Sequence, residues 1–252
     1  MDAMLERARA AGVKSMILTG GSLHESREAI ELARQLGFYA TAGCHPTRSA
    51  QFDKFRGGPA KYLEELDKLI AENLAGKGRV VAVGECGLDY DRTHFAPEEV
   101  QRRHFRSQLS LAKKYHLPLF LHSRAAHKDF VQILREEGYE KDGGKAVGGK
   151  GGVVHSFTGT AEEAADVNGC GLKTAENLAA TKSIRPDKIM LETATKPESF
   201  VYGRPVKGRN EPGAIGGVAW VVHKLSEGAS FEQVTEKAWK NTVEVFGLAE
   251  LQ

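Results

Sequence analysis

The sequence has 252 residues, of which 41% are hydrophobic and 27% charged, and its formal net charge is +2. These values are ordinary for a water-soluble globular protein and give no global signature of a nucleic-acid-binding chain. No run of about 18 apolar residues occurs, which excludes a membrane-spanning helix. A chain of this length can bury one large core, so we expect a single domain over residues 1–252.

The predicted elements alternate between helix and strand almost from the first residue. Apolar spacing of three and four indicates helices, and short apolar runs bounded by glycine or proline indicate strands. In chain order they are a helix over 1–9, a strand over 14–20, a helix over 25–36, a strand over 38–45, a helix over 59–74, a strand over 79–83, a helix over 97–115, a strand over 117–121, a helix over 128–137, strands over 152–157 and 188–193, and a helix over 230–243.

Alternation of this kind predicts a parallel sheet covered by helices, and the fold class is therefore α/β. The sequence gives six clear strands and a seventh, weaker one around 167–170, whereas a closed barrel of this type needs eight. No strand precedes the first helix. We therefore predict a TIM-barrel-like fold of the metal-dependent hydrolase type that is incomplete, with six to seven parallel strands.

The three cysteines, Cys44, Cys86 and Cys170, cannot all pair with one another and form no Cys-x-x-Cys motif. This usage is typical of a reducing compartment, so we expect an intracellular protein of the cytoplasm or nucleus. The first residues read as an amphipathic helix and not as a secretory signal. No obligate protein partner is evident.

Three apolar runs lead into residues that can bind a metal: Glu85, His122 and His155. They are 37 and 33 residues apart, and one strand-plus-helix unit of an eightfold barrel takes roughly 31 residues. The spacing therefore predicts that the three side chains lie at the same end of three successive strands, where the chemistry of such barrels occurs. One carboxylate and two imidazoles suit a divalent cation such as Mg, Mn or Zn. The alternative is a set of hydrogen-bonded structural residues.

Two further residues follow strand ends on the same rim, His45 and Arg124. Either could hold an anionic oxygen, and arginine would do so with two hydrogen bonds. A capping histidine and a surface ion pair are the structural alternatives. Asp89 and Asp91 are interpreted as loop-capping residues. The basic residues of 92–114 are either a solvated helix face or a rim that attracts phosphate.

At these residues the chain resembles the TatD family of metal-dependent deoxyribonucleases, and within it the eukaryotic TatD-like branch. The matching segments occur in the family's order and extend over nearly the whole chain. They are Ile17–Gly21, Ala42–Arg48, Val83–Asp89, Phe120–Arg124, Gly152–Phe157, Asn168–Thr174, Leu191–Thr193 and Arg209–Pro212.

The resemblance implies a metal-dependent hydrolase that cleaves DNA phosphodiester bonds with a divalent cation, typically from 3′ ends and preferably in single strands. Glu85 matches the family's bridging carboxylate, and His122 and His155 match its two central histidine ligands. By the same resemblance, His45 and Arg124 lie near the substrate phosphate. Asn210 falls in a segment that we expect to shape the substrate-binding rim.

The sequence departs from the family pattern in three ways. The family's first strand, which carries two metal ligands, is not present, and the region before Asn168 is shortened. Ala194 stands where the family has an aspartate that binds metal and accepts a proton. The chain is therefore interpreted as N-terminally truncated with internal losses, and its activity as impaired. The alternatives are a catalytically inactive remnant or binding protein, and an amidohydrolase-like enzyme for a small ester or amide.

Overall fold

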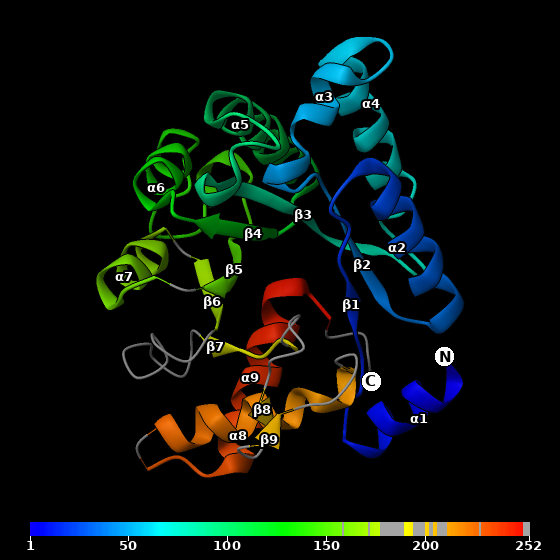
Figure 1. The fold of residues 1–252 in the computed structure, drawn as a ribbon, viewed down its shortest axis with the longest axis vertical. Helices are drawn as coiled ribbons and strands as arrows, with labels where there is room; N and C mark the ends of the chain where they lie inside the picture. Colours follow the sequence, from blue (N-terminus) through cyan, green and yellow to red (C-terminus); the bar gives the residue numbers. More distant parts are fainter. Residues whose placement is uncertain are drawn as a thin grey trace.

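The computed structural model describes residues 1–157, 159–170, 172–176, 189–193, 200–201, 204–205, 211–226 and 228–248. Its main feature is a curled sheet of parallel strands that follow one another in chain order (Figure 1). The strands are β1 (Ile17–Leu18), β2 (Tyr39–Ala42), β3 (Val80–Asp89), β4 (Leu119–Arg124), β5 (Gly152–Phe157), β6 (Leu172–Glu176) and β7 (Ile189–Met190).

Each of these strands pairs in parallel with the next. Among the described residues the sheet has seven strands, which agrees with the predicted six to seven, and β1 and β7 form its two edges. A separate antiparallel pair consists of β8 (Phe200–Val201) and β9 (Arg204–Pro205).

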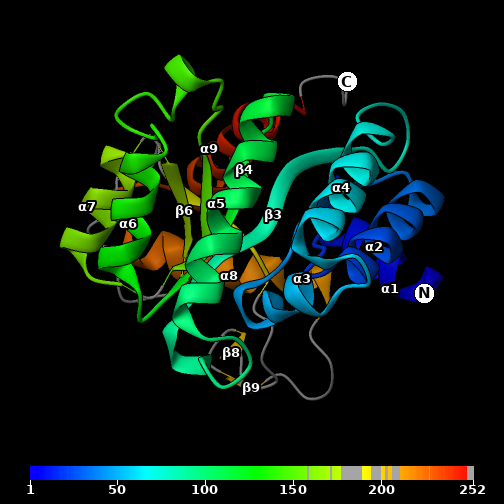
Figure 2. The same ribbon diagram turned by 90° about the horizontal axis from the view of Figure 1, so that it is seen from above.

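Helices cover both faces of the sheet: those that connect successive strands lie in an arc around its outside (Figure 2), and the last helix packs against the other face. They are α1 (Asp2–Ala10), α2 (Leu23–Leu36), α3 (Ala50–Lys54), α4 (Gly58–Ala71), α5 (Glu98–Tyr115), α6 (His127–Glu136), α7 (Ala161–Gly169), α8 (Ile215–Leu225) and α9 (Phe231–Phe246). Short 3-10 turns are η1 (Pro46–Arg48), η2 (Tyr90–Arg92), η3 (Lys145–Val147) and η6 (Pro212–Ala214).

Local sequence signals set the ends of several helices. Helix α2 begins where the Ser22 hydroxyl accepts a hydrogen bond from the Glu25 N–H, and it ends at Gly37, whose φ is +74°. Glycine suits that left-handed position because it has no Cβ to clash. The predicted capping box of Ser230 and Gln233 is present at the start of α9.

Both faces of the sheet are buried, as expected for parallel strands covered by helices. Val154 of β5 belongs to the larger cluster, in which Leu109 of α5 and Phe130 of α6 are fully buried. The adjacent Val153 belongs to a second cluster with Phe246 at the end of α9. Neighbouring residues of a strand face opposite sides, so the two clusters fix the strands from both faces.

Three differences from the predicted elements affect the site. The weak strand predicted at 167–170 is wrong, because a capping box of Thr160 and Glu163 starts α7, which continues to Gly169. The following strand is β6 instead. Strand β3 extends to Asp89, well beyond the predicted end at 83. Helix α8 was not predicted. No helix among the described residues is long and apolar enough to cross a membrane.

Candidate metal centre

Glu85 lies inside β3 and not at its end, because the strand continues for four more residues. The pairing of β3 with β4 shifts register between Gly84 and Cys86, which is the position of Glu85. Its N–H donates to the carbonyl of Gly20 at 2.8 Å, in the loop after β1. An irregularity of this kind redirects a side chain. The Glu85 side chain is only 16% exposed.

Gly87 brings the backbone of β3 close to that of β4 beside Glu85. It pairs with His122 in the sheet, and its φ is +140°. A Cβ placed on Gly87 would lie 1.9 Å from the carbonyl oxygen of His122. Only glycine allows this approach, which places a histidine of β4 next to the carboxylate of β3.

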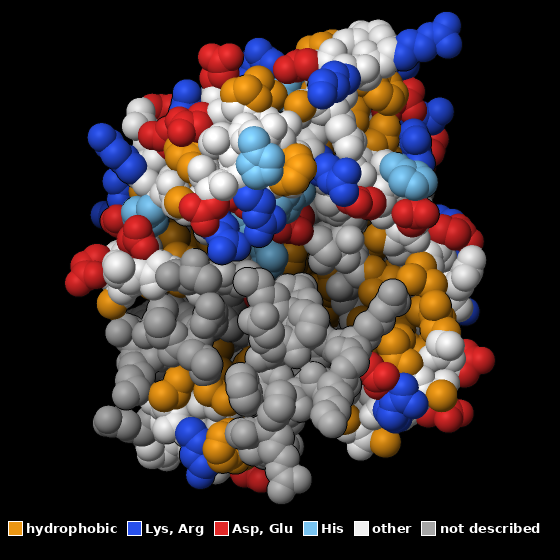
Figure 3. Space-filling view, in the orientation of Figure 1, with side chains coloured by type: hydrophobic (Ala, Val, Ile, Leu, Met, Phe, Trp, Pro, Cys, Tyr) orange, Lys and Arg blue, Asp and Glu red, His pale blue; other side chains and the backbone are white. Residues whose placement is uncertain are grey.

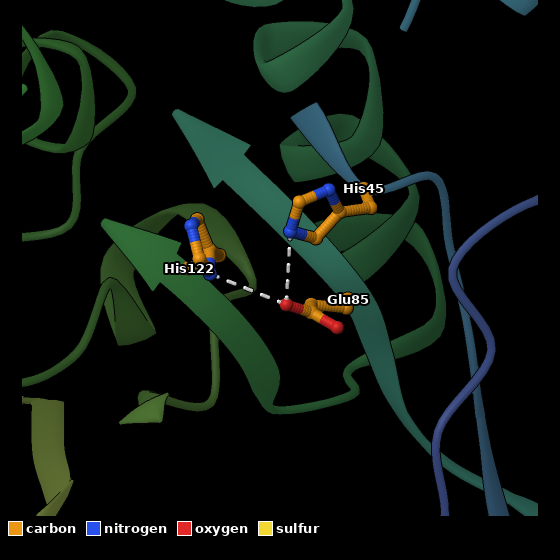
Figure 4. Close-up of side chains that lie close together, drawn as sticks. All are labelled: His45, Glu85 and His122. Carbon is orange, nitrogen blue, oxygen red and sulfur yellow. Dashed lines mark ion pairs between the residues drawn. The ribbon is translucent and has the colours of Figure 1, made fainter. Parts of the chain in front are cut away.

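Three imidazoles surround the Oε1 atom of Glu85, two of which are drawn in Figure 4. His155 Nε2 lies 2.7 Å from that oxygen, and His45 Nε2 and His122 Nδ1 each lie 3.3 Å from it. His122 and His155 come from β4 and β5, and His45 stands between β2 and η1. The three histidine side chains are 12 to 16% exposed.

Each imidazole is held at its other nitrogen by a side chain outside this cluster. The pairs are His122 Nε2 with Asp89 Oδ2 at 3.2 Å, His155 Nδ1 with Glu192 Oε2 at 3.3 Å, and His45 Nδ1 with Thr47 Oγ1 at 2.7 Å. Metal-binding histidines are oriented in this way, with one ring nitrogen on an outer partner and the other on the ion.

The electrostatics of the cluster favour a charged carboxylate. Burial acts to raise the pKa of Glu85, but the adjacent imidazoles of His122, His155 and His45 outweigh it, and the pKa lies well below 4.5. Burial acts to lower the pKa of His155, but Glu192 and Glu85 raise it to about 10. The pKa of His122 is also raised, because Asp89 and Glu85 outweigh the opposing effect of burial.

The donor set fits a divalent cation. Ligand atoms of His45, Glu85 and His122 all lie within 4.8 Å of one another. Among the described residues, Nδ1 of His122 is buried and has no hydrogen-bond partner, although it points to the Glu85 carboxylate. His155 contacts the same carboxylate oxygen but is not part of this mutual group. A cation held by Glu85 and imidazoles would occupy that nitrogen.

The other predicted site residues have different positions. Arg124 ends β4, and its Nε donates to Asp91 Oδ2 at 2.8 Å, while its side chain is 40% exposed. Asn210 lies outside the described residues, as does Ala194. The neighbouring Glu211 forms an ion pair with Arg7 of α1 at 2.6 Å.

Two site carboxylates were missed from the sequence. Asp89, interpreted there as a loop cap, is completely buried and contacts His122. Once β3 is known to reach Asp89, its position four residues after Glu85 places both on the same face of the strand. Glu192 follows β7, and its Oε1 accepts a hydrogen bond from the Ser156 N–H at 2.6 Å. Its place directly after an apolar run was the available signal.

The basic residues of α5 are engaged in ion pairs on the outer surface, which supports the interpretation as a solvated helix face. The partners come from the neighbouring helices. The pairs are Arg102 with Asp129, Arg103 with Asp53, Arg106 with Glu136, Lys113 with Glu137 and Lys114 with Asp67.

A mainly apolar cavity of about 410 Å³ adjoins the cluster on the inner side of the sheet. Glu85, His155 and Glu192 form part of its wall, and Phe120 and Trp239 are among its apolar lining residues. The charged groups of the site therefore lie between this cavity and the carboxyl ends of the parallel strands.

Comparison with known proteins identifies the family of this chain. A family model described as TatD-related DNase matches residues 1–247. The chain belongs to this family. It is 38% identical to a Schizosaccharomyces pombe protein named deoxyribonuclease Tat-D, over 96% of this chain and 86% of that protein.

Other members of the TatD family agree in sequence and in fold. A Cronobacter sakazakii protein named 3′-5′ ssDNA/RNA exonuclease TatD is 36% identical, with 94% of this chain and 86% of that protein covered. The crystal structure of a TatD family hydrolase from Entamoeba histolytica superposes with a TM-score of 0.80 at 28% identity, over 97% of this chain and 88% of that one. The predicted family and barrel-like fold are thus confirmed.

Proposed function

We propose that this protein is a metal-dependent deoxyribonuclease that removes nucleotides from the 3′ ends of single-stranded DNA. The observation that carries the proposal is the Glu85 carboxylate, enclosed by three imidazoles that outer partners orient, in a member of a DNase family. The polarity and the single-stranded substrate are those named for the Cronobacter sakazakii relative.

In this proposal Glu85, His122 and His155 hold one Mg, Mn or Zn ion. The imidazole of His45 lies within reach of the same position, because its ligand atom lies within 4.8 Å of those of Glu85 and His122. A divalent cation there supplies Lewis-acid polarisation of a phosphoryl oxygen and activation of water. Asp89 and Glu192 keep the rings of His122 and His155 in a fixed orientation. His45 and Arg124 contact the phosphate of the substrate, and Asn210 belongs to the substrate-binding rim.

Two considerations favour this function over its alternatives. The named relatives act on nucleic acid, which favours a polyanion over a small ester or amide. The cluster around Glu85 favours catalysis over an inactive remnant, because three protein ligands suffice for a catalytic metal. The three cysteines are unpaired and buried, which is typical of a reducing compartment, and we place the activity in the cytoplasm or nucleus.

The test uses purified protein and a 5′-labelled single-stranded oligonucleotide with Mg, Mn or Zn. We expect a ladder of shortened products, no shortening in EDTA, and protection of an oligonucleotide whose 3′ end is blocked. His155→Ala should abolish cleavage. His116→Asn is the matched control, because His116 is exposed outside the site and its φ of +51° suits asparagine.

Equal rates for wild type and His155→Ala would remove the proposed site. Cleavage of the blocked oligonucleotide at an unchanged rate would instead retain the nuclease and reject its 3′ polarity. A wild-type protein that binds metal and leaves DNA intact would favour the remnant or the small-substrate hydrolase.

A further inference from the structure

Two exposed aromatic side chains, His94 and Phe95, lie on the loop that follows β3, the strand that carries Glu85 and Asp89. Phe95 is 58% exposed, and among the described large hydrophobic side chains only Met1 is more exposed. The ring of His94, also exposed, lies 4.1 Å from that of Phe95 at an angle of 40°. An isolated exposed phenylalanine is unremarkable, so the significance of this pair depends on its position.

The pair stands on the loop of residues 90–97, which joins β3 to α5 at the mouth of the site. This rim loop starts directly after Asp89, the residue that holds His122. The Phe95 N–H donates to the Arg92 carbonyl at 3.1 Å, and Arg92 Nε lies 3.5 Å from Asp89 Oδ2. These contacts tie the backbone of the rim loop to the carboxylate that holds His122.

A buried glutamine clamps the rim loop at both ends. Gln101 has no exposed surface. Its side-chain oxygen accepts from the Asp89 N–H at 2.8 Å, and its amide donates to the carbonyls of Asp89 and Ala96 at 2.9 and 2.8 Å. Rings on a loop fixed in this way are preorganised, which lowers the entropy that binding would otherwise cost.

Positive charge accompanies the rings. The side chains of Arg92 and Arg124 are 41% and 40% exposed, and each is engaged through its Nε, on Asp89 and Asp91 respectively. Both side chains are therefore partly open to solvent. Figure 3 shows one face of the molecule, on which His side chains lie at the edge of a hollow beside Lys and Arg side chains.

We infer that Phe95, supported by His94, is a stacking platform for a base of the single-stranded nucleic acid whose phosphate lies at the metal centre. Arg92 and Arg124 face the backbone of the same strand. Aromatic stacking tolerates any base because every base has a π face, which is what an enzyme without sequence preference needs. This inference rests on the proposed function, because it assigns the substrate of that site.

Binding to two strands tests the platform separately from catalysis. Both are 5′-fluorescein 12-mers with phosphorothioate linkages, which resist cleavage; one carries thymine and the other carries abasic sugars. Fluorescence anisotropy in Mn gives both affinities. We expect Phe95→Ala to weaken binding of the thymine strand by about 5- to 100-fold, the effect of losing one stacked base, and to change the abasic strand less than about twofold.

Two variants control for other causes. Phe95→Trp keeps a π face and should retain the affinity of wild type within about threefold. Leu74→Ala removes a side chain that is 38% exposed after α4, away from the rim loop, and should bind both strands as wild type does.

Equal weakening of both strands by Phe95→Ala, or no weakening of either, overturns the inference. If the wild type still shortens unmodified single-stranded DNA in that case, the proposed nuclease function survives the loss of the platform. If the wild type binds neither strand and cleaves no DNA, both the platform and the proposed function are rejected.

Discussion

Replacement of Asp89 by asparagine should weaken metal binding without unfolding the protein. Asp89 is completely buried, and its Oδ2 accepts from Nε2 of His122 at 3.2 Å. When an ion is bound, this contact keeps the proton on Nε2 and leaves the lone pair of Nδ1 for the ion. In Asp89→Asn the side chain keeps its size but loses its charge, and its amide group can donate to Nε2. The proton of His122 would then move to Nδ1, the nitrogen that should bind the ion.

The expected magnitude follows from the geometry. Asp89 is one of three outer partners and leaves Glu85 and two other imidazoles in place. Loss of such a partner typically lowers metal affinity 10- to 100-fold, or by about 1.4 to 2.7 kcal/mol of binding free energy. The change should be smaller than that for His122→Ala, which removes the ligand itself.

Titration calorimetry with Mn measures the affinity directly, and thermal unfolding verifies that each variant is folded. Asp91→Asn is the matched control, because Asp91 is a surface carboxylate that contacts Arg124 and no imidazole of the cluster. An Asp89→Asn protein that binds Mn as tightly as Asp91→Asn would refute the assignment of Asp89 as an orienting partner.

Three other outcomes are expected. Gly87→Ala places a methyl group 1.9 Å from the His122 carbonyl oxygen at a φ of +140°. Denaturant unfolding should therefore show a free energy of unfolding lower by at least about 2 kcal/mol. Gly216→Ala is the control, because Gly216 has open space around it in α8, and its free energy of unfolding should be unchanged. Burial lowers the pKa of His104 below 6.5 although Asp53 opposes the shift. The unfolded chain therefore binds a proton at a higher pH than the native state does. The free energy of unfolding should fall as pH drops below about 6.5, by at most about 1.4 kcal/mol per pH unit. His104→Gln should flatten that slope between pH 7.5 and 5.5, and an unchanged slope would assign it to other groups. Removal of metal with EDTA should abolish cleavage and leave the circular dichroism spectrum native, because packed hydrophobic clusters on both faces of the sheet stabilise the fold. Loss of the native spectrum would contradict this.

Most of the fold could be predicted because its signals are local. The apolar run of β5 has the predicted bounds, and the serine-glutamine capping box starts α9 as expected. The failure at 167–170 has a physical cause. Val167 and Ala164 are both buried, three residues apart on one helix face, but the short apolar run can be read equally as a strand.

The candidate site was predictable only in its outline. Spacing placed Glu85, His122 and His155 on neighbouring strands, and the structure brings their side chains together at one carboxylate oxygen. The inclusion of His45 in the tightest group, and the roles of Asp89 and Glu192, depend on the register shift in β3 and on contacts between distant segments. No local pattern encodes such contacts.

The paired surface of α5 has a consequence for how salt should affect binding. Each lysine or arginine of that helix named above already has an acidic neighbour, so it releases few counterions when a polyanion approaches. Arg92 and Arg124 also have acidic neighbours, Asp89 and Asp91, so two neutralised phosphates are an upper limit. The logarithm of the binding constant should therefore fall with the logarithm of salt concentration at a slope no steeper than about −1.4. A protein of this kind would stay bound to the end of a nucleic-acid strand at ionic strengths that release a protein whose binding depends on many unpaired basic residues.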